Sequence, residues 1–155
     1  TDKSTPEEWP DMISPSLEEV RAEVKKLIPI AVPELVQIAE AEDGEPIGLA
    51  VTLPDYNQVI KRMNGKLFPF GWCKFLYYKN KINTVRLFAL MVVPEYHRKG
   101  VSAALYKHGM EVAKRRGYIG GDASSIHEFN LKIYNDALGS GGKAYRRFRI
   151  YQYKL

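Results

Sequence analysis

The sequence predicts an α+β fold in which helices pack on one mixed β-sheet. Two observations lead to this prediction: apolar runs of strand length alternate with amphipathic stretches of helix length, and the 155 residues suit a single domain. A chain of this length buries roughly 70% of its unfolded surface, which is enough for a core without disulfides. We therefore expect one domain over residues 1–155, with an irregular lead-in over 1–15.

The first third of the chain predicts a helix followed by a hairpin. Ser16 and Glu19 form a capping-box pattern, and apolar residues then recur at helical spacing. Asp43-Gly44 lies between two apolar runs and is a strong hairpin signal. The expected elements are a helix over 16–28, strands over 35–40 and 47–53, and a short helix over 55–65 with Asp55 as its N-cap.

Residues 55–80 are interpreted as a helical and aromatic segment inserted between two strands of the sheet. Four of its aromatic residues are Trp72, Phe75, Tyr77 and Tyr78. Hydrophobic periodicity does not decide whether 72–78 is a strand or a helix. The segment is either the lid or wall of a partly aromatic pocket, or a surface segment packed under a loop.

Residues 85–105 organise the second half of the chain. A β-branched run predicts a strand over 85–93, and a basic turn with His97, Arg98 and Lys99 follows. The next helix, over about 102–116, brings its unpaired amides and its positive dipole end to this turn. A strand, a cationic turn and a helix N-terminus in this order predict a phosphate-binding cradle, and Gly100 lets the backbone approach the ligand closely.

The remaining residues complete the sheet in this prediction. Glycines weaken the next apolar run, and such glycines often mark the close approach of a ligand. The expected elements are a strand over 118–126, a helix over 129–138 and a terminal strand over 144–153.

Charge is distributed unevenly along the chain. Residues 1–50 hold 4 lysines and arginines against 12 acids, a net charge of −8, and residues 51–155 hold 19 against 6, a net charge of +13. This asymmetry favours an anionic partner for the basic part, such as a phosphorylated cofactor or a nucleic acid. The alternative is an acidic front segment lying on a basic body.

Several classes of protein are disfavoured by the composition. The single Cys73 excludes an internal disulfide, and no histidine has partners at metal-ligand spacing, so we expect no metal. No apolar run reaches about 18 residues, and no signal peptide is visible at the start. We therefore expect a cytoplasmic protein without a membrane partner.

The basic turn resembles a known motif. The pattern Val92-x-Pro94-x-Tyr96-x-x-Lys99-Gly100-Val101-Ser102 is similar to the acyl-CoA-binding motif of the GNAT N-acyltransferase superfamily. Asn130, followed eleven residues later by Gly141, resembles the family's next landmark. The stretches Leu53–Gln58 and Leu67–Trp72 are also similar to a subgroup of larger bacterial GNAT-like proteins, whose C-terminal domain has this fold. The resemblance implies a mixed, mostly antiparallel sheet flanked by helices, here without the family's first strand and helix.

The resemblance also implies a cofactor, acetyl-CoA or another acyl-CoA. The amides of residues 98–103 would hold the pyrophosphate, and the backbone of residues 90–92 would pair with the pantetheine arm as an added strand would. An amide there could also polarise the thioester carbonyl. The residues expected to bind the cofactor are Leu90, Met91, Val92, His97, Arg98, Lys99, Gly100, Val101, Ser102, Ala103 and Asn130.

The catalytic groups are less clear, because the chain departs from the family pattern. His97 and Ser102 replace the usual first and last residues of the motif, and Ala137 stands where many members have a tyrosine acid. Asp122 is the best candidate base, directly or through a water, with a solvated carboxylate as the alternative. Tyr134, about one turn before Ala137, is the candidate acid.

Three functions follow from this reading. The first is an acetyl-CoA-dependent N-acetyltransferase that moves the acetyl group directly to an amine of a small molecule or peptide. The second is a non-catalytic acyl-CoA-binding module, because the tyrosine acid and a strand carboxylate are missing. The third, and least favoured, is a nucleic-acid-binding domain, because basic and aromatic residues interleave over 145–151. The oligomeric state stays open, with a homodimer as one option.

Overall fold

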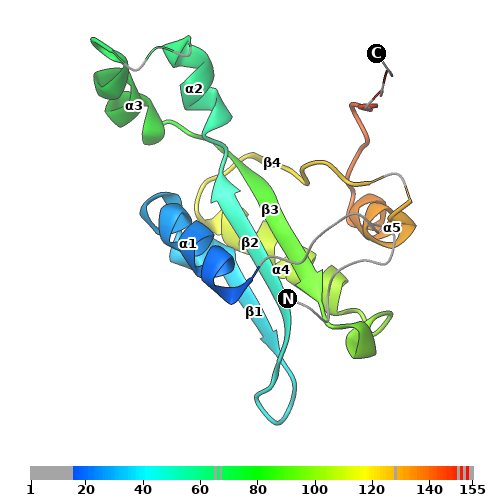
Figure 1. Ribbon diagram of the computed structural model, residues 1–155. Coiled ribbons are helices and arrows are strands. Elements are labelled where there is room, and N and C mark those ends of the chain that lie inside the picture. Colours follow the sequence, from blue (N-terminus) through cyan, green and yellow to red (C-terminus); the bar gives the residue numbers. More distant parts are fainter. Residues whose placement is uncertain are drawn as a thin grey trace.

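Figure 1 shows a computed structural model of the protein, which describes residues 16–64, 66, 68–127, 129–149, 151 and 153. Its sheet has the strand order β1-β2-β3-β4. The β1/β2 and β2/β3 pairs are antiparallel, and the β3/β4 pair is parallel. The predicted α+β fold with a mixed, mostly antiparallel sheet is therefore confirmed. The strands are β1 (Val36–Glu40), β2 (Pro46–Pro54), β3 (Thr84–Val92) and β4 (Gly120–Asp122).

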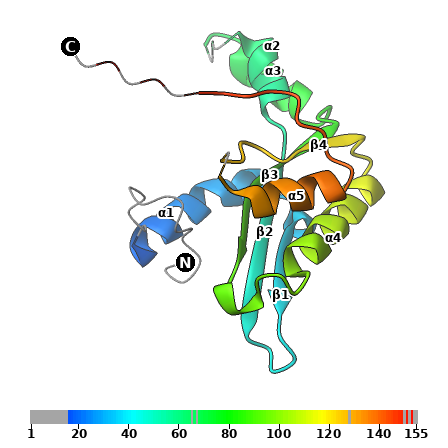
Figure 2. The same ribbon diagram turned by 90° about the vertical axis from the view of Figure 1, so that its right-hand side faces the viewer.

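Helices lie on both sides of this sheet. Figure 2 shows α1 on one face and α4 on the other, with α5 beside the β3 edge. The α-helices are α1 (Leu17–Leu27), α2 (Asn57–Met63), α3 (Gly71–Lys79), α4 (Val101–Arg115) and α5 (Leu131–Gly139). Short 3₁₀ turns are η2 (Ile28–Ile30), η3 (Pro33–Leu35) and η4 (Pro94–Tyr96).

The predicted capping box opens α1. The Glu19 amide donates to Ser16 Oγ (3.3 Å), and the Ser16 amide donates to Glu19 Oε2 (2.7 Å). These two bonds satisfy two amides that a helix N-terminus otherwise leaves without a partner. The predicted lead-in over 1–15 lies outside the described residues.

The core lies between α4 and the sheet. Leu105 of α4 packs with Ala50 of β2 and Val92 of β3, and all three are buried. A second cluster joins Leu35 and Val85 to the far end of the helix, where Val112 and Ala113 are buried. These α4 residues belong to the apolar stripe that helical spacing predicts, and they hold the helix firmly on the sheet.

The buried Gln37 of β1 ties the middle of α4 to the sheet. With its amide oriented to satisfy both groups, Gln37 donates to the Leu105 carbonyl (3.0 Å) and accepts from the Gly109 amide (3.1 Å). A Cβ on residue 109 would lie 3.4 Å from the nearest atom of the Gln37 side-chain amide, which is an ordinary van der Waals contact. Gln37 is therefore a satisfied polar group in the core.

In the inserted segment one local prediction is wrong, and one undecided stretch is now assigned. Asp55 is not the N-cap of α2, which is Tyr56; the Asp55 carboxylate instead accepts from the Asn57 amide (3.2 Å). The undecided stretch 72–78 is helical and belongs to α3. Its aromatic residues are compatible with a strand or a helix. In the fold this stretch is a helix that packs against α2.

The two last predicted strands are wrong in extent or existence. The expected strand over 118–126 is reduced to β4, which has three residues, two of them glycines. The terminal strand over 144–153 is absent from the described residues of that range. A strand needs a neighbouring edge and a buried face, but the short β4 offers little edge, and Tyr145, Phe148 and Tyr151 are all largely exposed.

Candidate functional site

The sheet opens where β3 and β4 stop pairing. Their parallel ladder ends at the pair Arg86 and Asp122, but β3 continues to Val92. On its other side β3 stays paired with β2 as far as Val92 opposite Gly48. Beyond Arg86, no strand among the described residues pairs with the outer edge of β3. This edge can therefore accept an extended ligand in the manner of an added strand.

The open edge leads directly into the basic turn. After η4, Arg98 has φ of 61° and Gly100 has φ of 81°, so two residues of the turn adopt left-handed backbone conformations. Gly100 takes this conformation without the strain that a side chain would add. The His97 ring donates from Nε2 to the Val92 carbonyl (2.9 Å), which ties the turn to the end of β3.

Helix α4 begins with amides that point out of the helix. In the first helical hydrogen bond, the Ala104 amide donates to the Gly100 carbonyl (2.9 Å). No side-chain hydrogen bond caps the start of the helix. The amides of residues 101–103 precede that bond and therefore have no partner within the helix. A Cβ on residue 100 would meet nothing within 4 Å, so the turn is open at Gly100.

Charge around the turn is positive. The side chains of Arg98 and Lys99 are exposed, and the Lys99 ammonium lies 4.6 Å from the centre of the Tyr96 ring. The positive end of the α4 dipole adds to this charge. A pyrophosphate fits these features, because open amides, left-handed backbone and exposed cations all favour a bound anion.

A partly buried polar cluster supports the start of α4 from the side of α5. Ser102 donates from Oγ to Asp136 Oδ2 (2.7 Å). Tyr106 lies one turn further along α4, and its hydroxyl is buried without a partner among the described residues. Burial raises the pKa of Tyr106, and the negative charge of Asp136 raises it further. Ser102 thus acts here as a bridge between α4 and α5.

The candidate base Asp122 lies at the point where the strands separate. Its Oδ1 accepts from the Ser124 amide (2.9 Å), and its Oδ2 accepts from the Tyr145 hydroxyl (2.9 Å). Arg86 donates from Nε to Ser124 Oγ (2.9 Å), and that hydroxyl donates to the Leu87 carbonyl (2.6 Å). The network fixes the half-buried Asp122 at the apex of the opening.

Tyr145 is a functional candidate that the sequence did not single out. Its hydrogen bond to the Asp122 carboxylate raises the pKa of Tyr145, and the charge of that carboxylate raises it further. The phenol is therefore protonated at neutral pH and can donate. Tyr145 and Asp122 are far apart in the chain and share no motif, so a sequence signal for the pair was lacking.

The other predicted residues lie on α5. Asn130 is the N-cap of this helix and accepts through Oδ1 from the Ile133 amide (3.2 Å). Tyr134 is half-buried in the first turn, and its amide donates to the Asn130 carbonyl (3.1 Å). No hydrogen bond among the described residues joins Tyr134 to Asp122, so the structure does not pair the two predicted catalytic groups.

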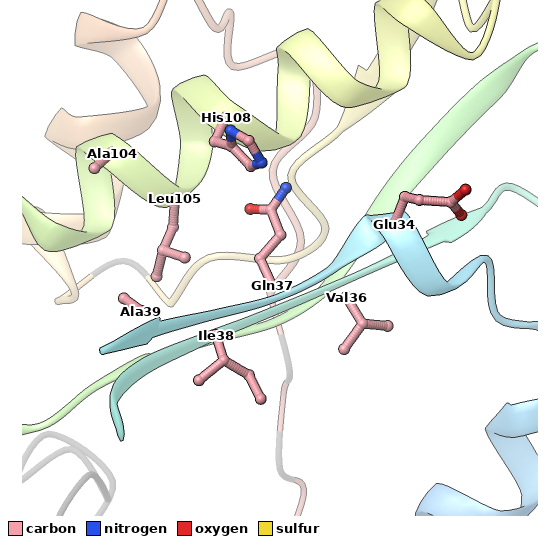
Figure 3. Close-up of a pocket in the computed structure, with 8 residues that line it drawn as sticks. All are labelled: Glu34, Val36, Gln37, Ile38, Ala39, Ala104, Leu105 and His108. Atoms are coloured by element: carbon pink, nitrogen blue, oxygen red, sulfur yellow. The ribbon is translucent and has the colours of Figure 1, made fainter. Parts of the chain in front are cut away.

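A separate hollow lies at the opposite edge of the sheet. It measures about 330 Å³ and is formed by β1 and α4, with Gln37, Leu105 and His108 among its lining residues (Figure 3). Since β1 and β4 are the two outer strands, this hollow is distant from the opening between β3 and β4. Within the described residues, no group of three or more His, Cys, Asp or Glu side chains could hold a metal ion.

Comparison with known proteins identifies the fold and the family. The model of the acetyltransferase (GNAT) family matches residues 5–123. The chain belongs to the GNAT acetyltransferase family. This membership confirms the predicted family. None of the helices in the described part of the chain is long and apolar enough to cross a membrane.

Two curated bacterial proteins are similar to this GNAT chain. One is Protein YghO of Escherichia coli, 30% identical over 139 residues, which are 86% of this chain and 35% of that protein. The other is the bacterial ceramide synthase of Caulobacter vibrioides, 31% identical over 144 residues, which are 88% of this chain and 37% of that protein. The chain thus spans little more than a third of the length of either relative.

Solved GNAT structures have the same fold. AAC(6')-Iy, in complex with the bisubstrate analogue CoA-S-monomethyl-acetylneamine, is 19% identical and has a TM-score of 0.58. The match covers 90% of this chain and 82% of that one. At this identity the likeness concerns the fold alone.

Proposed function

We propose that this GNAT chain is an N-acyltransferase that uses acetyl-CoA or another acyl-CoA and transfers the acyl group directly to an amine. The observation that carries the proposal is the junction of an open β3 edge with the left-handed turn at Arg98 and Gly100 and with the uncapped start of α4. Such a junction suits a ligand with an amide-bearing arm and a pyrophosphate.

In this proposal, different residues bind the pyrophosphate and the pantetheine arm of the cofactor. The amides of residues 98–103 bind the pyrophosphate, with the side chains of Arg98 and Lys99 adding positive charge. The backbone of Leu90, Met91 and Val92 pairs with the pantetheine arm along the open edge of β3. His97 and Asn130 have structural roles in this proposal. His97 ties the turn to β3, and Asn130 caps α5.

Proton transfer is assigned to the apex of the opening. Asp122 takes a proton from the acceptor ammonium, directly or through a water, so that the free amine can react. When bound, the thioester supplies the acyl group, whose carbon gains a bond to nitrogen as its bond to sulfur breaks. A tyrosine gives its proton to the leaving thiolate and regains one from the new amide nitrogen, which loses a proton once its bond to carbon has formed. Tyr134 is the candidate from the sequence, and Tyr145 is a second candidate because it already donates to Asp122.

The ceramide synthase relative suggests a class of acceptor. A ceramide is the amide of a long-chain amino alcohol, so a lipid-like amine and a long acyl group join small amines and peptides as candidates. We place this class first in a substrate panel.

One observation favours a non-catalytic acyl-CoA-binding module as the second candidate. Both oxygens of Asp122 already accept hydrogen bonds within the chain, from Ser124 and Tyr145. A base held in this way must exchange the Tyr145 bond for one to the substrate or its water before it can act. Binding of acyl-CoA without turnover on any amine of the panel would support this second function.

The test compares two aspartates with the same local geometry. The Asp43 carboxylate accepts from the amide two residues on (3.1 Å), as Asp122 does, but lies in the β1–β2 hairpin. We expect Asp122→Asn to lower turnover by roughly 10²- to 10⁴-fold, the usual contribution of a positioned base, and to leave CoA affinity unchanged. Asp43→Asn should change neither. Calorimetry measures binding, and release of free thiol measures turnover. Equal turnover of both variants would refute the role of Asp122, and absence of CoA binding by the wild type would refute the proposed function.

A further inference from the structure

An arm extends from the sheet between β2 and β3. We define the arm as residues 56–64, 66 and 68–82, which include α2 and α3. Both views show it beyond the end of the sheet, away from α4 and α5 (Figures 1 and 2). At its base, the Tyr56 hydroxyl donates to the Ile30 carbonyl (3.3 Å), and Gln58 donates to Thr84. These contacts anchor the base of the arm to the body of the protein.

The arm has a small interior and a large apolar exterior. Val59 is fully buried, and the Tyr56 and Phe75 rings stack with their centres 5.9 Å apart. Phe68 is 80% exposed and Phe70 is 70% exposed, although such side chains are normally shielded from water. The large apolar residues that the arm exposes are Ile60, Phe68, Phe70, Trp72, Leu76 and Tyr77. Six large exposed apolar side chains within one short segment favour an interaction surface.

The charge of the arm is of one sign. Residues 56–82 contain six lysines and arginines and no aspartate or glutamate. All six basic side chains are exposed: Lys61, Arg62, Lys66, Lys74, Lys79 and Lys81. Arg62 lies 4.8 Å from the centre of the Tyr78 ring, and Lys81 lies 4.1 Å from that of Tyr77. Cations and aromatic rings therefore lie close together at these two places, and the arm has no acid to neutralise its cations.

We propose that the arm docks on the surface of an anionic lipid bilayer. Aromatic and aliphatic side chains gain free energy by entering the boundary between headgroups and acyl chains, and lysine and arginine are attracted to anionic headgroups. A protein partner of acidic character would also match the charge, but Phe68, Phe70 and Trp72 are each more than half exposed, as side chains that enter a lipid interface must be. We expected no membrane partner from the sequence because it has no segment long enough to span a bilayer. Docking on the bilayer surface does not require a spanning segment.

The inference is independent of the proposed acyl transfer, because lipid binding requires no turnover. The probe is a set of vesicles of phosphatidylglycerol mixed with phosphatidylcholine, with pure phosphatidylcholine vesicles for comparison. Trp72 is a built-in reporter, since the chain has two tryptophans and Trp9→Phe leaves one. We expect co-sedimentation with the anionic vesicles, a blue shift of Trp72 emission, and weakening at high salt.

Two pairs of matched variants locate the contact. Lys66→Glu/Lys74→Glu reverses two charges of the arm, and Lys107→Glu/Lys114→Glu reverses two exposed charges of α4. The arm variant should lower the partition coefficient by roughly 25-fold or more, since each cation near an anionic surface contributes about five-fold. The α4 variant should leave it nearly unchanged.

The aromatic contribution is tested in the same assay. Phe68→Ser/Phe70→Ser should abolish the blue shift of Trp72, whereas Phe148→Ser, at a phenylalanine that is 75% exposed outside the arm, should preserve it. Absence of vesicle binding, or equal loss in the arm and control variants, would overturn the proposal. So would a dimer in sedimentation that Phe68→Ser/Phe70→Ser dissociates, or binding to single-stranded RNA in place of vesicles. Because CoA binding is measured separately, failure here leaves the proposed function intact.

Discussion

Gly48→Ala tests whether the packing of α4 on β2 sets the position of the amides that we propose bind the pyrophosphate. Gly48 lies in β2 opposite Val92, under the start of α4. A Cβ at this position would lie 3.1 Å from Val101 Cγ1 and 3.2 Å from Leu105 Cδ1. It would also lie 3.4 Å from the Met91 carbonyl oxygen, so a shift toward β3 offers little relief.

The cost follows from these distances. Carbon atoms attract best at about 3.5–4.0 Å, so both side-chain contacts are a few tenths of an ångström too short. Overpacking of this kind costs typically 1–3 kcal/mol, and in a domain of this size each kcal/mol lowers Tm by about 2–4 °C. Val101 is the first residue of α4, so relief of the clash moves the helix start. We expect CoA to bind about ten-fold more weakly, a loss of about 1.4 kcal/mol.

Calorimetry with CoA and thermal unfolding measure the two effects. Gly139→Ala is the matched control, because a Cβ there meets nothing within 4 Å. Removing a glycine at a compatible site should stabilise by about 0.4–1 kcal/mol and leave CoA affinity unchanged. A Gly48→Ala protein with wild-type stability and wild-type CoA affinity would refute the reasoning, since α4 would then not be seated by this contact.

Three further predictions concern stability. Tyr106→Phe should raise the free energy of unfolding by about 1 kcal/mol in urea titrations, because it removes a buried hydroxyl that has no partner among the described residues; no gain would indicate that the hydroxyl is satisfied. Leu105→Ala should lower the same quantity by about 2–5 kcal/mol, since Leu105 is 6% exposed and packs against β2 and β3. A hydrogen bond from its own amide, and then the contact with Arg116, lower the pKa of Glu34 below its ordinary 4.5. This carboxylate therefore stabilises the fold above pH 4.5 and loses that effect as pH falls through its lowered pKa, so Glu34→Gln should flatten the acid side of the Tm profile.

Local chemistry was enough to predict much of this protein from sequence. The capping box at Ser16, the hairpin at Asp43-Gly44 and the apolar stripe of α4 each depend on residues within a few positions of one another. The basic turn belongs to the same class, because a strand, a turn and a helix start are contiguous. For this reason the sequence alone predicted the start of α4 and the resemblance to the GNAT family.

Tertiary structure decided the features that join distant parts of the chain. Residues 72–78 are helical and pack with α3 on α2, and the described residues of 144–153 form no strand, since they have neither a paired edge nor a buried face. The bond between Tyr145 and Asp122, and the bridge from Ser102 to Asp136, link residues 23 and 34 positions apart. Sequence periodicity reports which face of an element is apolar, but a contact between separate elements depends on how they pack. The strand, basic turn and helix start over residues 85–105 were therefore predictable from the sequence, whereas the partners of Asp122 and Ser102 became visible once the helices lay on the sheet.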